Sequence, residues 1–357
     1  MGLFSRKKPT KTDSKSVNAN EHLIKVDTCF SEPPNEYGGA EPLENITSEQ
    51  YDIYVKLLNH FNAEDFTLPV NTEVAKDDPA LQKSLSEFEK FWLSRECLLR
   101  FLRAAKWNFN DAVANLSETM TWRREVGITY SDSNFENKAL DPDHVSIENE
   151  TGKEVLLGFD KHRRPLFYMK NGRQNTESSY RQVQQLIYMM ECATTLCPQG
   201  VEKLTVLIDL KGYKEPGIIS DKVPPLAITK LCLKVLQDYF PERMGKCLLT
   251  NIPWFAWAFL KIVYPFLDPA TREKAIFDEP YDKHVEKKQL DATYNGYLDF
   301  KYDHKVYWPD LVKKVDELRE KRFERWVKFG SKIGTAEWDY KGDHDEIKYP
   351  VDYRNVE

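Results

Sequence analysis

The chain has 357 residues, a length that suggests two or three domain-sized units. It is 41% hydrophobic and 30% charged, which is ordinary for a globular protein and excludes disorder over the whole chain. The net charge of −6 argues against a nucleic-acid-binding protein with a broad basic face.

Residues 1–45 are polar and show little hydrophobic periodicity, so we predict a disordered arm. The basic residues at its start could touch anionic lipid, although a solvated tail is the simpler interpretation. These residues are Arg6, Lys7, Lys8, Lys11 and Lys15. The arm lacks the apolar core of a signal peptide, and no apolar stretch reaches the roughly 20 residues that span a bilayer. We therefore expect a soluble, cytoplasmic protein whose membrane contact is peripheral.

The six cysteines form no C-x-x-C pair, and several lie inside apolar runs. We expect free, buried thiols in a reducing compartment rather than a disulfide framework or a zinc site. The common nucleotide-binding, hydrolase and metalloprotease motifs are absent from the sequence, and its seven histidines show no metal-ligand spacing. We therefore predict no cofactor and no catalytic residue.

Helical signals dominate residues 46–128, which we predict to form an N-terminal helical subdomain. Thr47 or Ser48 can cap a first helix, and Ser86 with Glu89 fits a capping box at the start of a second. A third helix is expected from about residue 110 to Gly127, and a loop at 63–84.

Strands alternate with helices from about residue 150, which predicts an α/β domain over residues 129–302 with a mixed, largely parallel sheet. The near-continuous apolar run at 204–208 suits a strand that is buried on both faces. The other expected strands are 155–159, 165–169 and 247–249, and the expected helices are about 178–195 and 225–239. Residues 303–357 add a charged helix at about 311–329 and a tail.

Residues 254–264 read WFAWAFLKIVY and are apolar on nearly every side, with Lys261 as the only charge. A helix of this length is about 17 Å long, too short for a bilayer core of about 30 Å. Such a helix is either buried in the core or a movable lid with one face on lipid. Composition leaves both open, and Trp254 and Trp257 suit a membrane interface.

Several motifs occur together and in order. They are Leu98-Leu99-Arg100-Phe101-Leu102-Arg103, Ile208-Asp209-Leu210-Lys211-Gly212, Tyr239-Phe240-Pro241-Glu242-Arg243, Asn251-Ile252-Pro253 and Phe266-Leu267-Asp268-Pro269. In this combination the chain resembles the CRAL-TRIO lipid-binding family, and its 253–257 and 306–309 segments resemble the fungal pleiotropic-drug-resistance branch of phosphatidylinositol-transfer proteins. The resemblance implies a sheet that floors an apolar lipid pocket and a gate helix at 254–264 that closes it.

The resemblance also implies the site residues. Glu242, Thr271 and Lys274 correspond to the family's inositol-phosphate contacts, and the residue types suit the chemistry, because an ammonium neutralises a phosphodiester and a carboxylate accepts hydrogen bonds from sugar hydroxyls. An arginine of the family's pattern is replaced here by Ala105, which leaves the neighbouring Lys106 as a candidate contact.

We further assign Asp160, in the predicted hairpin turn, to the head-group site. The gate helix would contact the membrane, and one strand would line the pocket. The expected gate residues are Trp254, Phe255, Trp257, Phe259 and Leu260, and the expected pocket wall is Leu204, Val206 and Ile208.

Relatives that also carry phosphatidylcholine have hydroxyl residues where this chain has Leu204 and Val206. An apolar side chain cannot form a hydrogen bond with a buried choline phosphate, and an unpaired buried polar group is costly. We therefore predict a phosphatidylinositol-transfer protein with weak or no phosphatidylcholine binding.

The expected partners are a phospholipid cargo, the surface of endomembranes such as the endoplasmic reticulum, Golgi and endosome, and a phosphoinositide kinase. Three other interpretations stay open: a carrier of a sterol or isoprenoid, a lipid-sensing scaffold for a lipid-modifying enzyme, and an unrecognised lipid hydrolase.

Overall fold

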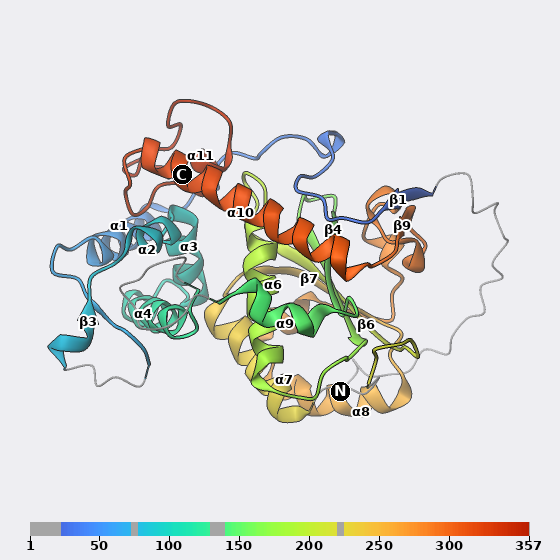
Figure 1. The fold of residues 1–357 in the computed structure, drawn as a ribbon. Coiled ribbons are helices and arrows are strands. Elements are labelled where there is room, and N and C mark those ends of the chain that lie inside the picture. Colours follow the sequence, from blue (N-terminus) through green and yellow to red (C-terminus); the bar gives the residue numbers. More distant parts are fainter. Residues whose placement is uncertain (1–22, 73–77, 129–139, 220–224, 357) are drawn as a thin grey trace.

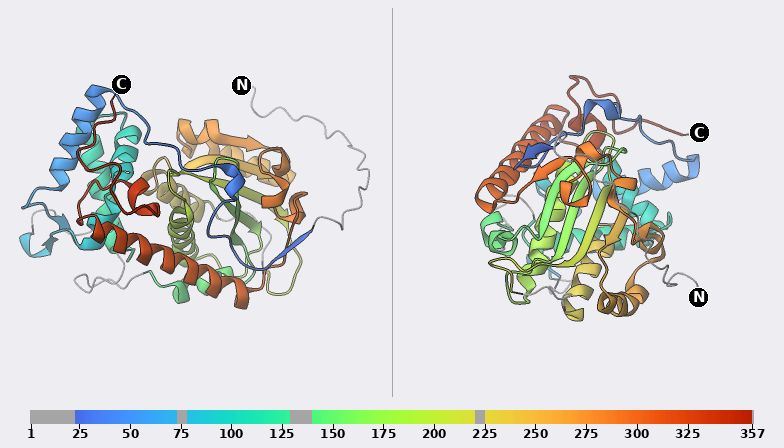
Figure 2. Two further views of the ribbon diagram at one scale, coloured as in Figure 1. Left: turned by 90° about the horizontal axis from the view of Figure 1, so that it is seen from above. Right: turned by 90° about the vertical axis from the view of Figure 1, so that its right-hand side faces the viewer.

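The structure is a computed structural model that describes residues 23–72, 78–128, 140–219 and 225–356 (Figure 1). A helical lobe lies to one side of a five-stranded sheet, and one long helix, α10, runs across both (Figure 2). This arrangement confirms the predicted fold class, a helical region followed by an α/β domain.

The helical lobe contains α1 (Ser48–Phe61), α2 (Glu87–Trp92), α3 (Arg95–Ala104) and α4 (Phe109–Glu125). Both predicted caps are present. The hydroxyls of Thr47 and Ser86 each accept a hydrogen bond from the backbone N–H three residues later, and their own backbone N–H groups donate to the side chains of Gln50 and Glu89. The predicted loop at 63–84 contains a short hairpin of β2 (Leu68–Pro69) and β3 (Gln82–Lys83), with a 3-10 turn at Pro79–Leu81.

The main sheet has the order β4-β5-β6-β7-β8. Its strands are β4 (Glu154–Phe159), β5 (Pro165–Gly172), β6 (Leu204–Gly212), β7 (Met244–Thr250) and β8 (Ala275–Phe277). The first pair is antiparallel, as the predicted hairpin requires, and the remaining pairs are parallel.

The connections between the parallel strands are α6 (Tyr180–Leu196), α7 (Leu226–Lys234) with a π-helical turn at Val235–Tyr239, and α8 (Trp254–Val263) with α9 (Pro269–Lys274). Each connection steps one strand further in the same direction. Because such crossovers are right-handed, all of these helices lie on one face of the sheet, which we call the helix face. The rings of Trp257 on α8 and Phe277 on β8, 5.7 Å apart, agree with this arrangement.

The opposite face of the sheet is covered by residues 281–300. This segment consists of 3-10 turns at Tyr281–Lys283, Lys287–Gln289 and Ala292–Tyr294, followed by β9 (Leu298–Phe300). The ring of Tyr168 on β5 stacks on that of Tyr294 at 5.8 Å. The Asp209 carboxylate on β6 accepts hydrogen bonds from the hydroxyls of Tyr213 and Tyr294.

The N-terminal segment is more ordered than predicted. β1 (Ile24–Val26) pairs in parallel with β9, and the buried Cys29 thiol donates a hydrogen bond to Asp310. The prediction of a disordered arm to residue 45 is therefore wrong for these residues, because a polar segment can be held by backbone pairing without any hydrophobic periodicity. The basic residues at 6–15 lie outside the described part of the chain.

The C-terminal helix α10 (His304–Lys328) begins seven residues before its predicted start, because Pro309 is accommodated inside it. The Tyr307 hydroxyl donates to the backbone oxygen of Leu156 at 2.9 Å and accepts from its nitrogen at 2.7 Å, so α10 closes the outer edge of β4. The remaining short elements are 3-10 turns at Asn35–Tyr37, Ile147–Asn149 and Tyr264–Phe266, and helices α5 (Pro142–Ser146) and α11 (Glu337–Lys341).

Candidate functional site

The helix face of the sheet is incompletely covered. Val206 and Ile208 are half-buried, although β6 is the central strand and helices lie over it. By contrast, Leu207 between them, on the opposite face, is fully buried at 0% exposure. Met169, the partner of Ile208 on β5, is also half-buried. Solvent therefore reaches an apolar space between the sheet and its helices.

The covering helices pack loosely over this space. α7 and α9 contain no buried residue, and among the described side chains of α8 only Ala256 and Val263 are buried. The predicted pocket wall is thus accessible at Val206 and Ile208. Leu204 differs, since it lies at the start of β6 with 0% exposure, inside the main hydrophobic core.

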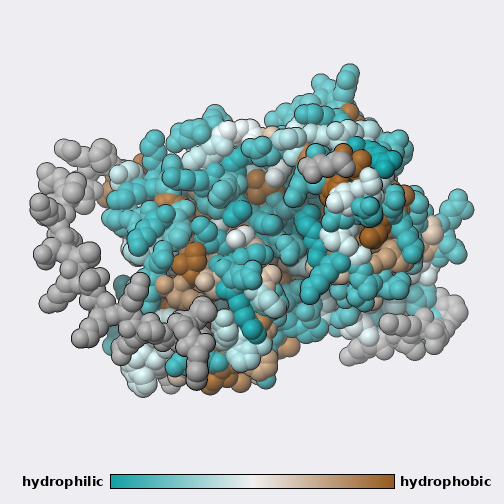
Figure 3. Space-filling model, turned by 180° about the vertical axis from the view of Figure 1, so that it is seen from behind, coloured by the Kyte–Doolittle hydropathy of each residue, from teal (hydrophilic) through white to brown (hydrophobic). Residues whose placement is uncertain are grey.

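Helix α8 carries apolar side chains on its outer surface as well as its inner one. Trp254 is 78% exposed, and Ile262 is 54% exposed. Trp257, Phe259 and Leu260 are half-buried, and the side chain of Phe255 is outside the described part of the structure. Hydrophobic residues gather along the lower edge of the molecule, where Figure 1 places α8 (Figure 3). The helix predicted at 254–264 is observed at Trp254–Val263, and an exposed apolar surface of this size is typical of a partner or membrane contact.

Glu242 and Lys274 lie at the same edge of the sheet. Cys247 on β7 pairs with Ala275 on β8, which is the first pair between these two strands. Lys274 directly precedes Ala275, and Glu242 lies five residues before Cys247. Both side chains are half-buried, and neither makes a hydrogen bond or ion pair within the described part of the chain. Two opposite charges that are partly desolvated and unpaired are suited to bind the polar part of a ligand.

The conformation at this edge is specific. Glu242 has a φ of 59°, in the left-handed region that is unusual for a residue other than glycine. Thr271 lies on the first turn of α9, where its hydroxyl donates to the cap residue Asp268 at 2.5 Å. The Thr271 oxygen therefore keeps its acceptor capacity for a ligand.

Lys106 and Asp160 are less closely connected with this edge. Lys106 is exposed in the turn between α3 and α4, without an ion pair among the described residues. Asp160 is buried, and its carboxylate accepts hydrogen bonds from the backbone of His162 and Arg164 and from the Thr205 hydroxyl at 2.7 Å. These contacts give Asp160 a structural role in the β4–β5 turn.

Comparison with known proteins identifies the family. Residues 149–296 match the model of the CRAL/TRIO domain, and residues 53–118 match that of the CRAL/TRIO N-terminal domain. The chain belongs to the CRAL-TRIO family.

Curated CRAL-TRIO relatives match this chain over different lengths. Phosphatidylinositol transfer protein PDR17 of Saccharomyces cerevisiae is 59% identical over 99% of both chains, which confirms the predicted branch of the family. A CRAL-TRIO domain-containing protein of Schizosaccharomyces pombe is 41% identical over 88% of this chain, which corresponds to 29% of that longer protein. Another from Saccharomyces cerevisiae, YKL091C, is 29% identical over 64% of this chain and 80% of its own.

The sequence motifs of the CRAL-TRIO family did not indicate a buried acid on the helix face. Glu154 on β4 pairs with Met169 and is 8% exposed, and its Oε2 has no hydrogen-bond partner within the described structure. Burial raises the pKa of the Glu154 carboxyl to about 8, so the acid is mainly neutral at pH 7. In the sequence, Glu154 is a carboxylate at the start of an apolar strand. A solvent-exposed acid at a strand end would give the same pattern, so the sequence does not indicate that Glu154 is buried.

No helix in the described part of this CRAL-TRIO protein is long and apolar enough to cross a membrane. Within the same residues, no group of three or more potential ligands could hold a metal ion. All six cysteines are unpaired thiols, as the sequence predicted.

Proposed function

We propose that this chain carries one phosphatidylinositol molecule between membranes, with the acyl chains in the apolar space on the helix face of the sheet. The observation that carries the proposal is the partial exposure of Val206 and Ile208 on the central strand, beneath α7 and α8. A filled core would bury these side chains as completely as it buries Leu207. The full-length similarity to a phosphatidylinositol transfer protein supports the choice of cargo.

The head group would lie at the edge of the sheet that carries Glu242 and Lys274. Lys274 would neutralise the phosphodiester, and Glu242 would accept hydrogen bonds from inositol hydroxyls. Thr271, whose hydroxyl already donates to Asp268, would accept a further one. Lys106 and Asp160 remain predictions for this site, with the exposed Lys106 able to reach a ligand more readily than the buried Asp160.

Helix α8 would serve as the gate. Transferring two acyl chains from a bilayer to water costs on the order of 25 kcal/mol, at about 0.8 kcal/mol for each of roughly 30 methylene groups. A gate that enters the interface through Trp254 would let the lipid move without crossing water. This mechanism requires a pocket, a lid and a head-group clamp, and it requires no nucleophile, so we propose a transfer protein rather than an enzyme.

The pocket wall supports weak or no phosphatidylcholine binding. Val206 is apolar and faces the proposed lipid space, so it offers no hydrogen bond to the phosphate of a buried phosphatidylcholine head group. We also propose that the protein acts at the surface of endomembranes, among them the endoplasmic reticulum, Golgi and endosome. There it would present its lipid to a phosphoinositide kinase.

The decisive test is identification of the lipid that co-purifies with the native protein, by mass spectrometry, with the Lys274→Ala variant beside it. We expect phosphatidylinositol in the native protein and at least a tenfold loss in the variant. Lys288→Ala is the matched control, because Lys288 is a 64% exposed surface lysine in the segment that covers the opposite face of the sheet. Recovery of a sterol or isoprenoid, or equal loading in Lys274→Ala, would refute the proposed cargo, and recovery of lipid breakdown products would indicate a hydrolase.

A further inference from the structure

The buried carboxyl group of Glu154 lies on the helix face of the sheet, and the proposed head-group site does not use it. Glu154 is 8% exposed and is the first residue of β4. It belongs to a row of paired residues that crosses all five strands. The row consists of Glu154, Met169, Ile208, Leu249 and Phe277. Because directly paired residues lie on the same side of a sheet, Glu154 shares the helix face with Ile208, the half-buried wall of the proposed lipid space.

Helix α7 and its π-helical turn cover this part of the helix face. Ile228, Cys232 and Leu236 are spaced four residues apart, so they form one stripe, and all three pack against the main hydrophobic core. Burial, and after it the charge of Glu154, raises the pKa of the Cys232 thiol to about 12. Such an electrostatic effect requires the carboxyl group to be near this thiol. The carboxyl group of Glu154 therefore points from the sheet into the space under α7.

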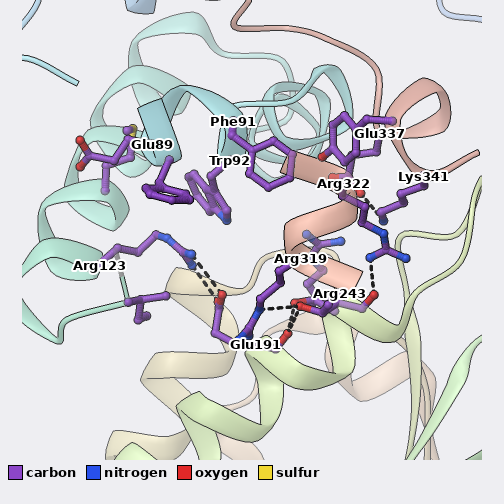
Figure 4. Close-up of a pocket in the computed structure, with 16 residues that line it drawn as sticks. Glu89, Phe91, Trp92, Arg123, Glu191, Arg243, Arg319, Arg322, Glu337 and Lys341 are labelled. Carbon is purple, nitrogen blue, oxygen red and sulfur yellow. Dashed lines mark hydrogen bonds and ion pairs between the residues drawn. The ribbon is translucent and has the colours of Figure 1, made fainter. Parts of the chain in front are cut away.

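The other buried acids in the described part of the chain have partners for their carboxylates. In the cavity between the helical lobe and α10, for example, Glu191 forms an ion pair with Arg123 at 2.8 Å, and Glu337 forms one with Lys341 at 2.5 Å (Figure 4). Oε2 of Glu154, by contrast, has no hydrogen-bond partner among the described residues. A buried polar atom without a partner is costly, so this carboxyl group is a candidate ligand contact.

The charged residues nearest to Glu154 do not neutralise it. Lys153 precedes it in the chain, but its ammonium donates to Glu148 at 2.8 Å and to Gln174 at 3.2 Å. Burial therefore dominates and raises the pKa of the Glu154 carboxyl to about 8. At pH 7 the group is mainly neutral, and it presents one O–H donor and one free carbonyl acceptor to the space under α7.

The polar parts of the proposed phosphatidylinositol cargo do not reach Glu154. Phe277 is the member of the row on β8, and Lys274 lies three residues before it. Four strand spacings of about 4.8 Å and three residues of about 3.3 Å each place Lys274 about 20 Å from Glu154. The glycerol esters lie next to the phosphate, so only the acyl chains would come near Glu154, and they offer no hydrogen bond.

Water is also a poor partner at this position. A buried water molecule needs two to four polar partners. Strand pairing places Met169 beside Glu154, and the effect on its pKa places Cys232 there as well. A thioether and a thiol form only weak hydrogen bonds. A ligand that combines its own polar group with an apolar body fits these surroundings better.

We propose that Glu154 binds the hydroxyl group of a second class of cargo, an apolar lipid with a single hydroxyl and no phosphate. The proposal rests on the lipid space of the proposed function. A hydroxyl both donates and accepts, so it can satisfy the O–H and the carbonyl oxygen of the neutral acid together. An amine would instead create a buried ion pair, whose desolvation is costly. The apolar body would occupy the space that the acyl chains of phosphatidylinositol otherwise fill, so the two cargoes exclude each other.

The test measures the pickup of radiolabelled lipids by the full chain from phosphatidylcholine vesicles. Oleyl alcohol and cis-9-octadecene share one chain and differ in the hydroxyl group, and cholesterol and cholestane are the corresponding pair with a ring system. The quantity of interest is the ratio of hydroxyl lipid to hydrocarbon in each pair. Comparing this ratio between variants cancels the preference of the vesicles themselves.

Glu154→Leu should lower the ratio about tenfold in at least one pair, as expected for the loss of a buried hydrogen bond. Glu154→Gln should keep it, because an amide also donates and accepts. Met169→Leu is the matched control, since it changes the neighbouring side chain of the row with little change in volume. Glu154→Leu removes a buried polar group without a partner, so its Tm should not fall below that of the parent chain, and a loss of fold would be visible.

A ratio in Glu154→Leu that stays within about twofold of Met169→Leu in both pairs would overturn the proposal. The pair with the larger fall identifies the natural ligand as a chain alcohol or as a ring alcohol. Such a lipid recovered beside phosphatidylinositol from the native protein would be the second cargo.

Phosphatidylinositol pickup by the same variants reports on the proposed function separately. Glu154→Leu should take up phosphatidylinositol as the parent chain does, because its acyl chains need only an apolar wall, and added phosphatidylinositol should displace the hydroxyl lipid. A parent chain that binds the hydroxyl lipid but no phosphatidylinositol would refute the proposed function alone. Phosphatidylinositol binding without any effect of Glu154→Leu on the ratio would refute only the role of Glu154.

Discussion

Replacing Trp254 by alanine tests the membrane contact of α8 most directly. Trp254 is the first residue of α8 and is 78% exposed, so little of its side chain contributes to the packing of the fold. An indole at this position suits the membrane interface, where its ring is half in hydrocarbon and half in water. We expect Trp254→Ala to leave stability nearly unchanged and to weaken membrane binding.

The magnitude follows from the exposed area. A tryptophan offers at most about 250 Å² of surface, so a 78% exposed side chain presents roughly 200 Å² to the bilayer. If half of this area enters the hydrocarbon boundary, at about 25 cal/mol per Å², the loss on truncation is about 2.5 kcal/mol. This free energy corresponds to a reduction of about 60-fold in partitioning onto vesicles.

The assay measures co-sedimentation with phosphatidylinositol-containing vesicles and, in parallel, the rate of phosphatidylinositol transfer between donor and acceptor vesicles. Both should fall in Trp254→Ala. Val327→Ala is the control, since Val327 is also exposed, at 48%, but lies near the end of α10 beside the helical lobe (Figure 1). If Trp254→Ala binds vesicles within twofold of Val327→Ala, α8 is not the membrane contact and the reasoning fails.

Three further substitutions test the pocket and the core. Val206→Thr places a hydroxyl on the proposed pocket wall, and we expect measurable phosphatidylcholine pickup in a transfer assay, where the parent chain shows little; unchanged lipid selectivity would count against this wall. Glu154 keeps its proton in the folded state up to a pKa of about 8 but ionises near 4.5 when unfolded, so the unfolded state is favoured increasingly as pH rises between these values. Glu154→Gln should therefore raise the free energy of unfolding by about 3 kcal/mol at pH 7, with almost no gain at pH 4, and urea denaturation showing the same difference at both pH values would contradict the buried neutral acid. Arg124→Met leaves Glu89 buried without its partner and should cost about 3–5 kcal/mol in the same assay, whereas a loss below 1 kcal/mol would show that the pair is not buried in solution.

Local sequence patterns predicted the elements whose structure is decided locally. The caps at Thr47 and Ser86 depend on side chains three residues apart, and both occur as predicted. The apolar run at 204–208 became the central strand, and the bounds of α8 followed from the proline residues on either side of it. Prediction was less successful at the C-terminal helix, which was expected to begin at about residue 311 but begins at His304 and includes Pro309.

Family resemblance supplied the position of the gate helix and the residues of the head-group clamp, which no spacing rule could provide. Glu242 and Lys274 are 32 positions apart, and only the pairing of β7 with β8 brings them to one edge of the sheet. Sequence reasoning also assigned Leu204 to the pocket wall with Val206 and Ile208. Because side chains alternate along a strand, all three residues lie on the same face of the sheet. Alternation does not show how far neighbouring segments cover each position, and Leu204 is completely buried.

The sequence by itself determined the order of helices and strands, the apolar character of α8 and the absence of a catalytic motif, because these depend on residues that are neighbours along the chain. Only the tertiary structure decided that β1 pairs with β9 and that, among the described residues, the buried Glu154 Oε2 has no hydrogen-bond partner. Burial and charge balance are sums over segments distant in sequence. They become defined only when the chain has folded, and they set the properties on which the proposed lipid site depends.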